Sequence, residues 1–351
     1  MSDGNQSGRT GHVSSVDAAR GLLALSVMAF HSLSNESIAA VENVGYYAVY
    51  AFFVISGFSL WISYYGKLQT SSDVRSYLLK RFFRIAPLYY LALLIRILLY
   101  PLPPTWPLDL PANITLMLGF YNPGATSLIT GGWSLGIEFV FYLLLPILFV
   151  AVQSLRALVV VATMAIAMQV VFVNLILGTA EVMTGPLWAS YSQPVSFAGY
   201  FLAGCLIGEL FRAGPKKHYR HALTIAGAAL IGFALVTSPY PVGFLTGWRG
   251  LLLTTLTIVF VAAAAFVPPV TGKLLKVSIW LGVISYPVYL LHPLVHYSLH
   301  KYGVPWAPLR IVLVFALTIA AAHYVSKYFE QPARRLGGSI AFRPKRDPEP
   351  T

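Results

Sequence analysis

The chain has 351 residues, of which 57% are hydrophobic and only 10% charged, and its mean hydropathy is +0.70. Soluble domains carry about a quarter charged residues, so this composition excludes a soluble fold. The net charge of +12 would suggest a nucleic-acid partner in a soluble protein. Here the basic residues are concentrated in alternate connections between apolar segments, which is a signal of membrane topology, so we expect no nucleic-acid partner. The single cysteine, Cys205, excludes an intrachain disulfide and a cysteine-rich metal site, and we expect no metal.

Apolar segments long enough to cross a bilayer core of about 30 Å recur along the whole chain. They predict an all-α integral membrane protein, a polytopic bundle of about ten transmembrane helices. We place these near residues 16–33, 43–63, 82–100, 133–151, 157–177, 194–211, 221–237, 249–267, 277–298 and 308–328. We expect a flexible cytoplasmic tail at 1–13, one transmembrane domain at 14–336 and a basic cytoplasmic tail at 337–351.

The distribution of lysine and arginine sets the predicted orientation. If the N-terminus is cytoplasmic, 19 of the 24 basic residues fall in inner segments and only 3 in outer segments, namely Arg249, Lys301 and Arg310. Basic residues concentrate on the cytoplasmic side of membrane proteins, so both termini are expected there. The longest outer connection, 101–132, has six prolines and no basic residue. It either folds over the outer mouth of the bundle or is a plain tether.

Arg20 and His31 are charged or titratable residues inside the first predicted span. Eleven residues at 100° each make three turns plus about 20°, so both share one helix face, about 16 Å apart along the axis. Such residues are costly in hydrocarbon and often mark functional paths. The alternatives are a packed histidine at 31 and a snorkelling cation at 20.

Three further residues are predicted near the outer ends of their spans: Glu138, His292 and Arg96. Glu138 is expected at the depth of His31, where a carboxylate would fix the imidazole tautomer; otherwise it is hydrogen-bonded at a helix start. His292 lies in a proline-distorted helix and either joins this group or satisfies freed backbone groups. Arg96 would orient an anionic or polyol substrate, or pair with Glu138.

Arg81 and Arg84 are three residues apart at the predicted inner start of the third span. Their spacing presents a forked basic site suited to phosphates. Basic clusters in this position also bind lipid head groups or simply fix topology.

The motifs occur in an order that resembles the acyltransferase-3 family of membrane proteins over residues 14–336. The resemblance rests on Arg20 followed by His31 (R-x10-H), FFVISGF at 52–58, RFFRIAPLYY at 81–90, WSLGIEFVFY at 133–142, YPVYLLHP at 286–293 and FEQPARR at 329–335.

This resemblance implies transfer of an acyl group, typically acetyl, from acetyl coenzyme A or a related thioester to a carbohydrate hydroxyl. The acceptor would be a surface polysaccharide, lipopolysaccharide or other glycolipid, and the location the bacterial inner membrane. Carried over by position, His31 is the expected base or acyl relay, and Glu138 its support. Arg20 is the motif partner of His31 and is expected to bind the coenzyme along its pantetheine arm, whereas Arg81 and Arg84 are expected to hold the coenzyme's phosphates.

We assign Arg96, Trp133, Ser134 and His292, near the outer side, to binding of the acceptor. Direct attack by the acceptor and an acylated His31 both remain open. The rival interpretation is a glycan transporter or flippase, in which the same buried charges line a substrate path.

Overall fold

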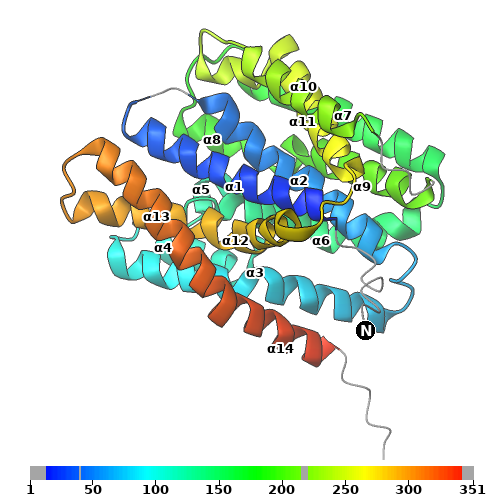
Figure 1. Ribbon diagram of the computed structural model, residues 1–351, viewed down its shortest axis with the longest axis horizontal. Coiled ribbons are helices and arrows are strands. Elements are labelled where there is room, and N and C mark those ends of the chain that lie inside the picture. Colours follow the sequence, from blue (N-terminus) through cyan, green and yellow to red (C-terminus); the bar gives the residue numbers. More distant parts are fainter. Residues whose placement is uncertain (1–12, 39–40, 215–219, 342–351) are drawn as a thin grey trace, which may run out of the picture.

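The computed structural model describes residues 13–38, 41–214 and 220–341 (Figure 1). Within these ranges the regular structure is helical and contains no strand. The expected tail at 1–13 lies outside the described residues except for Val13, and so do residues 342–351 of the expected C-terminal tail.

Each of the ten predicted spans corresponds to a helix. These are α1 (Ser14–Asn35), α2 (Glu42–Tyr64), α3 (Ser71–Leu99), α6 (Gly132–Ala151), α7 (Leu155–Leu177), α9 (Ala198–Ala213), α10 (Ala222–Leu235), α11 (Gly247–Phe266), α12 (Gly272–Lys301) and α13 (Ala307–Val325). Eight helices among the described residues are long and apolar enough to cross a membrane, whereas α9 and α10 have only 16 and 14 residues. The prediction of an all-α polytopic membrane protein is confirmed.

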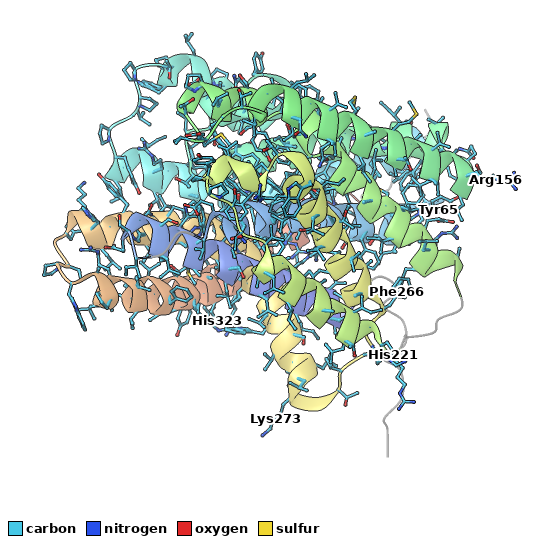
Figure 2. The ribbon with its side chains drawn as sticks, turned by 90° about the horizontal axis from the view of Figure 1, so that it is seen from above. Tyr65, Arg156, His221, Phe266, Lys273 and His323 are labelled. Atoms are coloured by element: carbon cyan, nitrogen blue, oxygen red, sulfur yellow. The ribbon has the colours of Figure 1, made fainter. Side chains whose placement is uncertain are left out.

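The helices alternate in direction, as the predicted spans require. Figure 2 shows Tyr65 after the end of α2, Arg156 at the start of α7 and Phe266 at the end of α11 on the same side of the molecule. We call this the inner side, because the predicted inner connections carry most of the basic residues.

Helix α3 begins eleven residues before the predicted span. Thr70 and Asp73 form a capping box, in which the Thr70 hydroxyl accepts from the Asp73 N–H and the Asp73 carboxylate accepts from the Thr70 N–H. Arg81 and Arg84 were expected at the inner start of this helix, but they lie ten and thirteen residues beyond Ser71. The hydropathy-based prediction omitted the polar first turns, which extend the helix beyond its apolar part on the inner side.

The outer connection after α3 is folded. It contains α4 (Trp106–Thr115), the 3₁₀ turn η1 (Met117–Phe120) and the short helix α5 (Pro123–Thr126). The buried Asn113 side chain ties it together, accepting from Tyr89 Oη at 2.6 Å and from the Leu128 N–H at 3.0 Å. A buried amide with these partners is typical of a fixed loop, not of a tether.

Helix α1 packs between α2 and α12, and α2 packs on its other side against α9 (Figure 1). The α2–α9 contact is very close. A Cβ atom on Gly57 would lie 2.0 Å from the Phe201 carbonyl oxygen, and one on Gly204 would lie 2.0 Å from the Val54 carbonyl oxygen. Small residues let helix backbones approach in this way in membranes.

The C-terminal end of the bundle returns toward α3. Helix α13 continues through a π-helical turn, η4 (Ser326–Glu330), into α14 (Gln331–Ala341), which packs along α3. Ser76 of α3 donates to the Ala341 carbonyl at 2.6 Å. Residues 337–341, which were predicted to begin a tail, are therefore the last turn of a docked helix.

Candidate active site

Two cavities lie along α1 and share part of their walls. The inner cavity has a volume of about 290 Å³ and is lined by the first turns of α1 with residues of α2, α3, α6, α12 and α14. The outer cavity has a volume of about 480 Å³ and is lined by the last turns of α1 and by the folded connection after α3. Val49 of α2 and Tyr289 of α12 line both cavities. The two cavities therefore adjoin across these two side chains.

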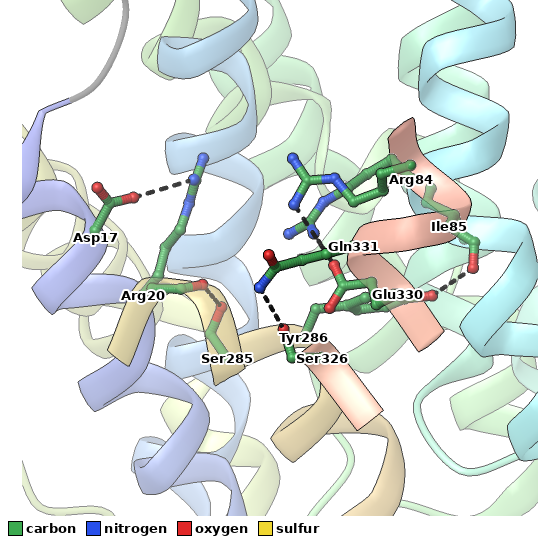
Figure 3. Close-up of polar contacts among 11 residues, drawn as sticks. Asp17, Arg20, Arg84, Ile85, Ser285, Tyr286, Ser326, Glu330 and Gln331 are labelled. Carbon is green, nitrogen blue, oxygen red and sulfur yellow. Dashed lines mark hydrogen bonds and ion pairs between the residues drawn. The ribbon is translucent and has the colours of Figure 1, made fainter. Parts of the chain in front are cut away.

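The inner cavity gathers the three arginines predicted to hold a coenzyme. Arg20 donates to Ser59 Oγ at 2.6 Å, and Arg81 donates to Tyr64 Oη at 3.2 Å. Arg84 pairs with Glu330. Figure 3 shows that α1, α3, α12 and the C-terminal segment deliver the side chains around Arg20 and Arg84. The structure thus brings residues that are 64 positions apart in the sequence into one positively charged site.

Glu138 also lines the inner cavity, so its expected pairing with His31 is wrong. Its carboxylate accepts hydrogen bonds from Ser56 Oγ of α2 and from Tyr142 Oη one helical turn further along α6. The proposed pairing of Arg96 with Glu138 is wrong as well, because Arg96 lines the outer cavity. The position of Glu138 in the sequence of α6 did not reveal which of the two cavities its side chain enters.

The outer cavity contains the two histidines that the sequence singled out. The rings of His31 and His292 are 5.3 Å apart between centroids. His292 is 2% exposed, and its Nδ1 lies 2.9 Å from the Val288 carbonyl oxygen, which can only accept. Nδ1 therefore carries the proton, and in the neutral ring Nε2 is an acceptor. Within the described part of the chain, Nε2 has no hydrogen-bond partner.

The other residues predicted to bind the acceptor lie in the outer cavity or at the wall that the two cavities share. Arg96 donates to the Pro101 carbonyl at 3.2 Å, and its guanidinium lies 4.1 Å from the Tyr100 ring centre. Trp133 lines the outer cavity. Ser134 lines the inner cavity instead, and its Oγ lies 2.8 Å from Tyr289 Oη, so it helps to hold the shared wall.

Several residues of the site were not singled out from the sequence. Ser56 and Ser59 hold Glu138 and Arg20, Tyr142 binds Glu138, and Tyr289 forms the boundary. The two serines were detectable as small polar residues three positions apart in an otherwise apolar span, which places them on one helix face. The partners of these serines were not detectable from the sequence, because no local pattern encodes contacts between distant helices.

These features define a polytopic membrane protein with a basic inner cavity and an imidazole-containing outer cavity that meet near the middle of the bundle. A family model described as an acyltransferase domain matches residues 13–326. The chain therefore belongs to the acyltransferase-3 family and is a multi-pass membrane acyltransferase. Comparison with curated proteins and with solved structures gives no significant match.

Proposed function

We propose that this protein transfers an acyl group, most simply acetyl, from cytoplasmic acyl-coenzyme A to a hydroxyl of a surface or lipid-linked carbohydrate. The observation that carries the proposal is the contact between the two cavities at Val49 and Tyr289. A donor bound by the inner arginines would reach the imidazoles without leaving the protein. The bacterial cytoplasmic membrane is the proposed location.

The inner cavity has the chemistry that a phosphorylated donor needs. Guanidinium groups bind phosphate oxygens through two parallel hydrogen bonds, which makes arginine well suited to this ligand. Arg20, Arg81 and Arg84 line one cavity at the inner side. Because Arg20 and His31 are about 16 Å apart along α1, the arm that carries the thioester would run outward along this helix.

The outer cavity has the chemistry that the acceptor needs. His31 would take the proton of the acceptor hydroxyl as its oxygen attacks the thioester carbonyl carbon. The new carbon–oxygen bond forms, the carbon–sulfur bond breaks, and the thiolate leaves with the coenzyme. The proton held by His31 then passes to the thiolate or to water. His292 Nε2, an acceptor in the same cavity, would help to orient the hydroxyl.

The test is transfer of radiolabelled acetyl from acetyl-coenzyme A to glycan acceptors by purified protein in liposomes. His31→Ala should lower transfer by 100-fold or more, the usual contribution of a general base being about 10²–10⁴. Its affinity for the donor should change less than about twofold, since His31 lies in the outer cavity. His300→Ala, an exposed histidine at the end of α12, is the matched control and should retain activity. Normal transfer by His31→Ala would overturn the mechanism.

The donor site has its own test. Arg81→Gln removes a guanidinium from the inner cavity and should weaken donor binding about 10- to 100-fold, as expected for a charged hydrogen bond. Arg75→Gln, an exposed arginine of the same helix outside the cavity, is the control. Wild-type protein that binds no acyl-coenzyme A would refute the donor assignment.

A further inference from the structure

The C-terminal segment adds a fourth arginine to the inner cavity. Arg334 of α14 lines this cavity together with Arg20, Arg81 and Arg84. It lies beyond residue 326, where the match to the acyltransferase family model ends. Its side chain is 44% exposed, compared with 26% for Arg20 and 22% for Arg84. Arg334 is thus the more accessible group, as expected at the cytoplasmic mouth of the cavity.

Glu330 holds this arginine and Arg84 together. Its carboxylate is 2% exposed, pairs with Arg84, and lies 3.7 Å from Arg334 through the same oxygen, Oε1. Glu330 ends the π-helical turn η4, and π turns inside helices occur frequently at functional sites. Figure 3 shows the Glu330 carboxylate directed at Arg84, with Gln331 beside it. One buried carboxylate therefore orients two guanidinium groups from different helices.

The four arginines at this cavity outnumber the carboxylates of Asp17, Glu138 and Glu330. Arg20, Arg81 and Arg84 all lie near enough to repel Arg334 electrostatically. Among the described residues Arg334 makes no hydrogen bond, and its ion pair with Glu330 is too long to be one. Its five N–H groups are thus available to an anionic ligand. A ligand that carries several phosphates would relieve the repulsion.

We infer that Arg334 binds the phosphate monoester of the donor nucleotide and that Glu330 is the positioning residue for Arg334 and Arg84. The inference rests on the proposed function, in which coenzyme A is the donor. Its ribose phosphate lies at the end farthest from the thioester, with the diphosphate between them. When the thioester lies at the outer cavity, Arg20, Arg81 and Arg84 contact the diphosphate. Arg334, at the mouth of the inner cavity, then contacts the phosphate monoester.

The experiment compares coenzyme A with 3′-dephospho-coenzyme A as competitors of radiolabelled acetyl-coenzyme A, using full-length protein in uncharged detergent. Arg334→Gln should weaken coenzyme A binding by about tenfold or more. It should leave binding of the dephospho compound within twofold of wild type. Arg335→Gln, the adjacent exposed arginine that does not line the cavity, should match wild type for both ligands. This variant controls for a general effect of charge near the membrane.

Glu330→Gln tests the positioning role. It should reduce the preference for coenzyme A over its dephospho form, because Arg334 is no longer held in place. It should also weaken the binding of both ligands, because Arg84 loses its orientation. A merely structural role would lower the unfolding temperature without changing this preference. Arg334→Gln that binds both ligands like wild type, or loses both equally, would overturn the inference and leave the donor assignment intact. Wild-type protein that binds neither ligand would overturn both.

Discussion

Substituting Gly57 by alanine tests whether the close contact between α2 and α9 positions the inner site. Gly57 is flanked by Ser56, which binds Glu138, and is followed two residues later by Ser59, which binds Arg20. A Cβ atom at position 57 would lie 2.0 Å from the Phe201 carbonyl oxygen, where ordinary contact begins near 3.4 Å. Both sides of this contact are backbone, so the helices must separate by about 1.4 Å.

This displacement is large compared with the tolerance of a hydrogen bond. If α2 takes up the whole shift, the 2.6 Å bond from Arg20 to Ser59 lengthens to about 4 Å and is lost. Misplacement of catalytic geometry by 1 Å can cost about 100-fold in rate, so we expect a 10- to 100-fold loss of transfer. Overpacking should also cost about 1–3 kcal/mol of stability.

The measurements are thermal unfolding in detergent and acetyl transfer in liposomes. With an unfolding entropy of about 2.1 cal/mol/K per residue, 351 residues give roughly 0.7 kcal/mol/K, so the midpoint should fall by about 1.5–4 °C. Gly227→Ala in α10 is the control, because its Cβ would meet nothing within 4 Å. It should stabilise the helix by about 0.5–1 kcal/mol and leave activity unchanged. Unchanged midpoint and activity for Gly57→Ala would refute the reasoning.

Two further predictions concern the shared wall and the outer end of α1. Val49→Phe should narrow the passage beside Tyr289 and lower transfer by about 100-fold, because the thioester no longer reaches His31. Val159→Phe, on an exposed face of α7, is the control, and equal transfer by both variants would contradict the proposed passage. Glu36 accepts a hydrogen bond from Arg310 at 2.7 Å, which holds the pKa of its carboxyl below the usual value of 4.5. Because the pKa of Glu36 is lower in the folded than in the unfolded chain, its ionised carboxylate stabilises the fold above about pH 4.5. This stabilisation is lost as the pH falls through the pKa of the folded state. Glu36→Gln, which removes the ion pair with Arg310, should therefore lower the unfolding midpoint at pH 7, and its difference in midpoint from wild type should shrink below about pH 4.5. A difference independent of pH would contradict the assignment.

The helices were predictable from sequence because hydropathy responds to the bilayer and not to neighbouring helices. All ten predicted spans are helices in the structure. The errors lie where the chain leaves the apolar region. The polar first turns of α3 and the helix α14 both pack on other helices, so tertiary contacts and not hydropathy hold them in place. Sequence accordingly placed the start of α3 too late and ended the domain before Gly337.

The site was predictable in part, for a related reason. Helical periodicity relates residues on one helix, and it placed Arg20 and His31 on one face of α1, where they line the inner and outer cavities in turn. It carries no information about the relative rotation of two helices. The supposed contact between Glu138 and His31 depended on that rotation and was wrong, whereas the pairing of Arg84 with Glu330, 246 residues away, was not foreseen.

Glu138 differs from Glu36, Glu209 and Glu330 in the partners of its carboxylate. Glu36, Glu209 and Glu330 each pair with an arginine, an arrangement that offsets the cost of burying both charges. Glu138 makes no ion pair among the described residues and is held by the hydroxyls of Ser56 and Tyr142. Glu138 lines the inner cavity together with Arg20, Arg81 and Arg84. We therefore propose that Glu138 acts on the donor side of the reaction, and that His31 and His292 in the outer cavity act on the acceptor without it.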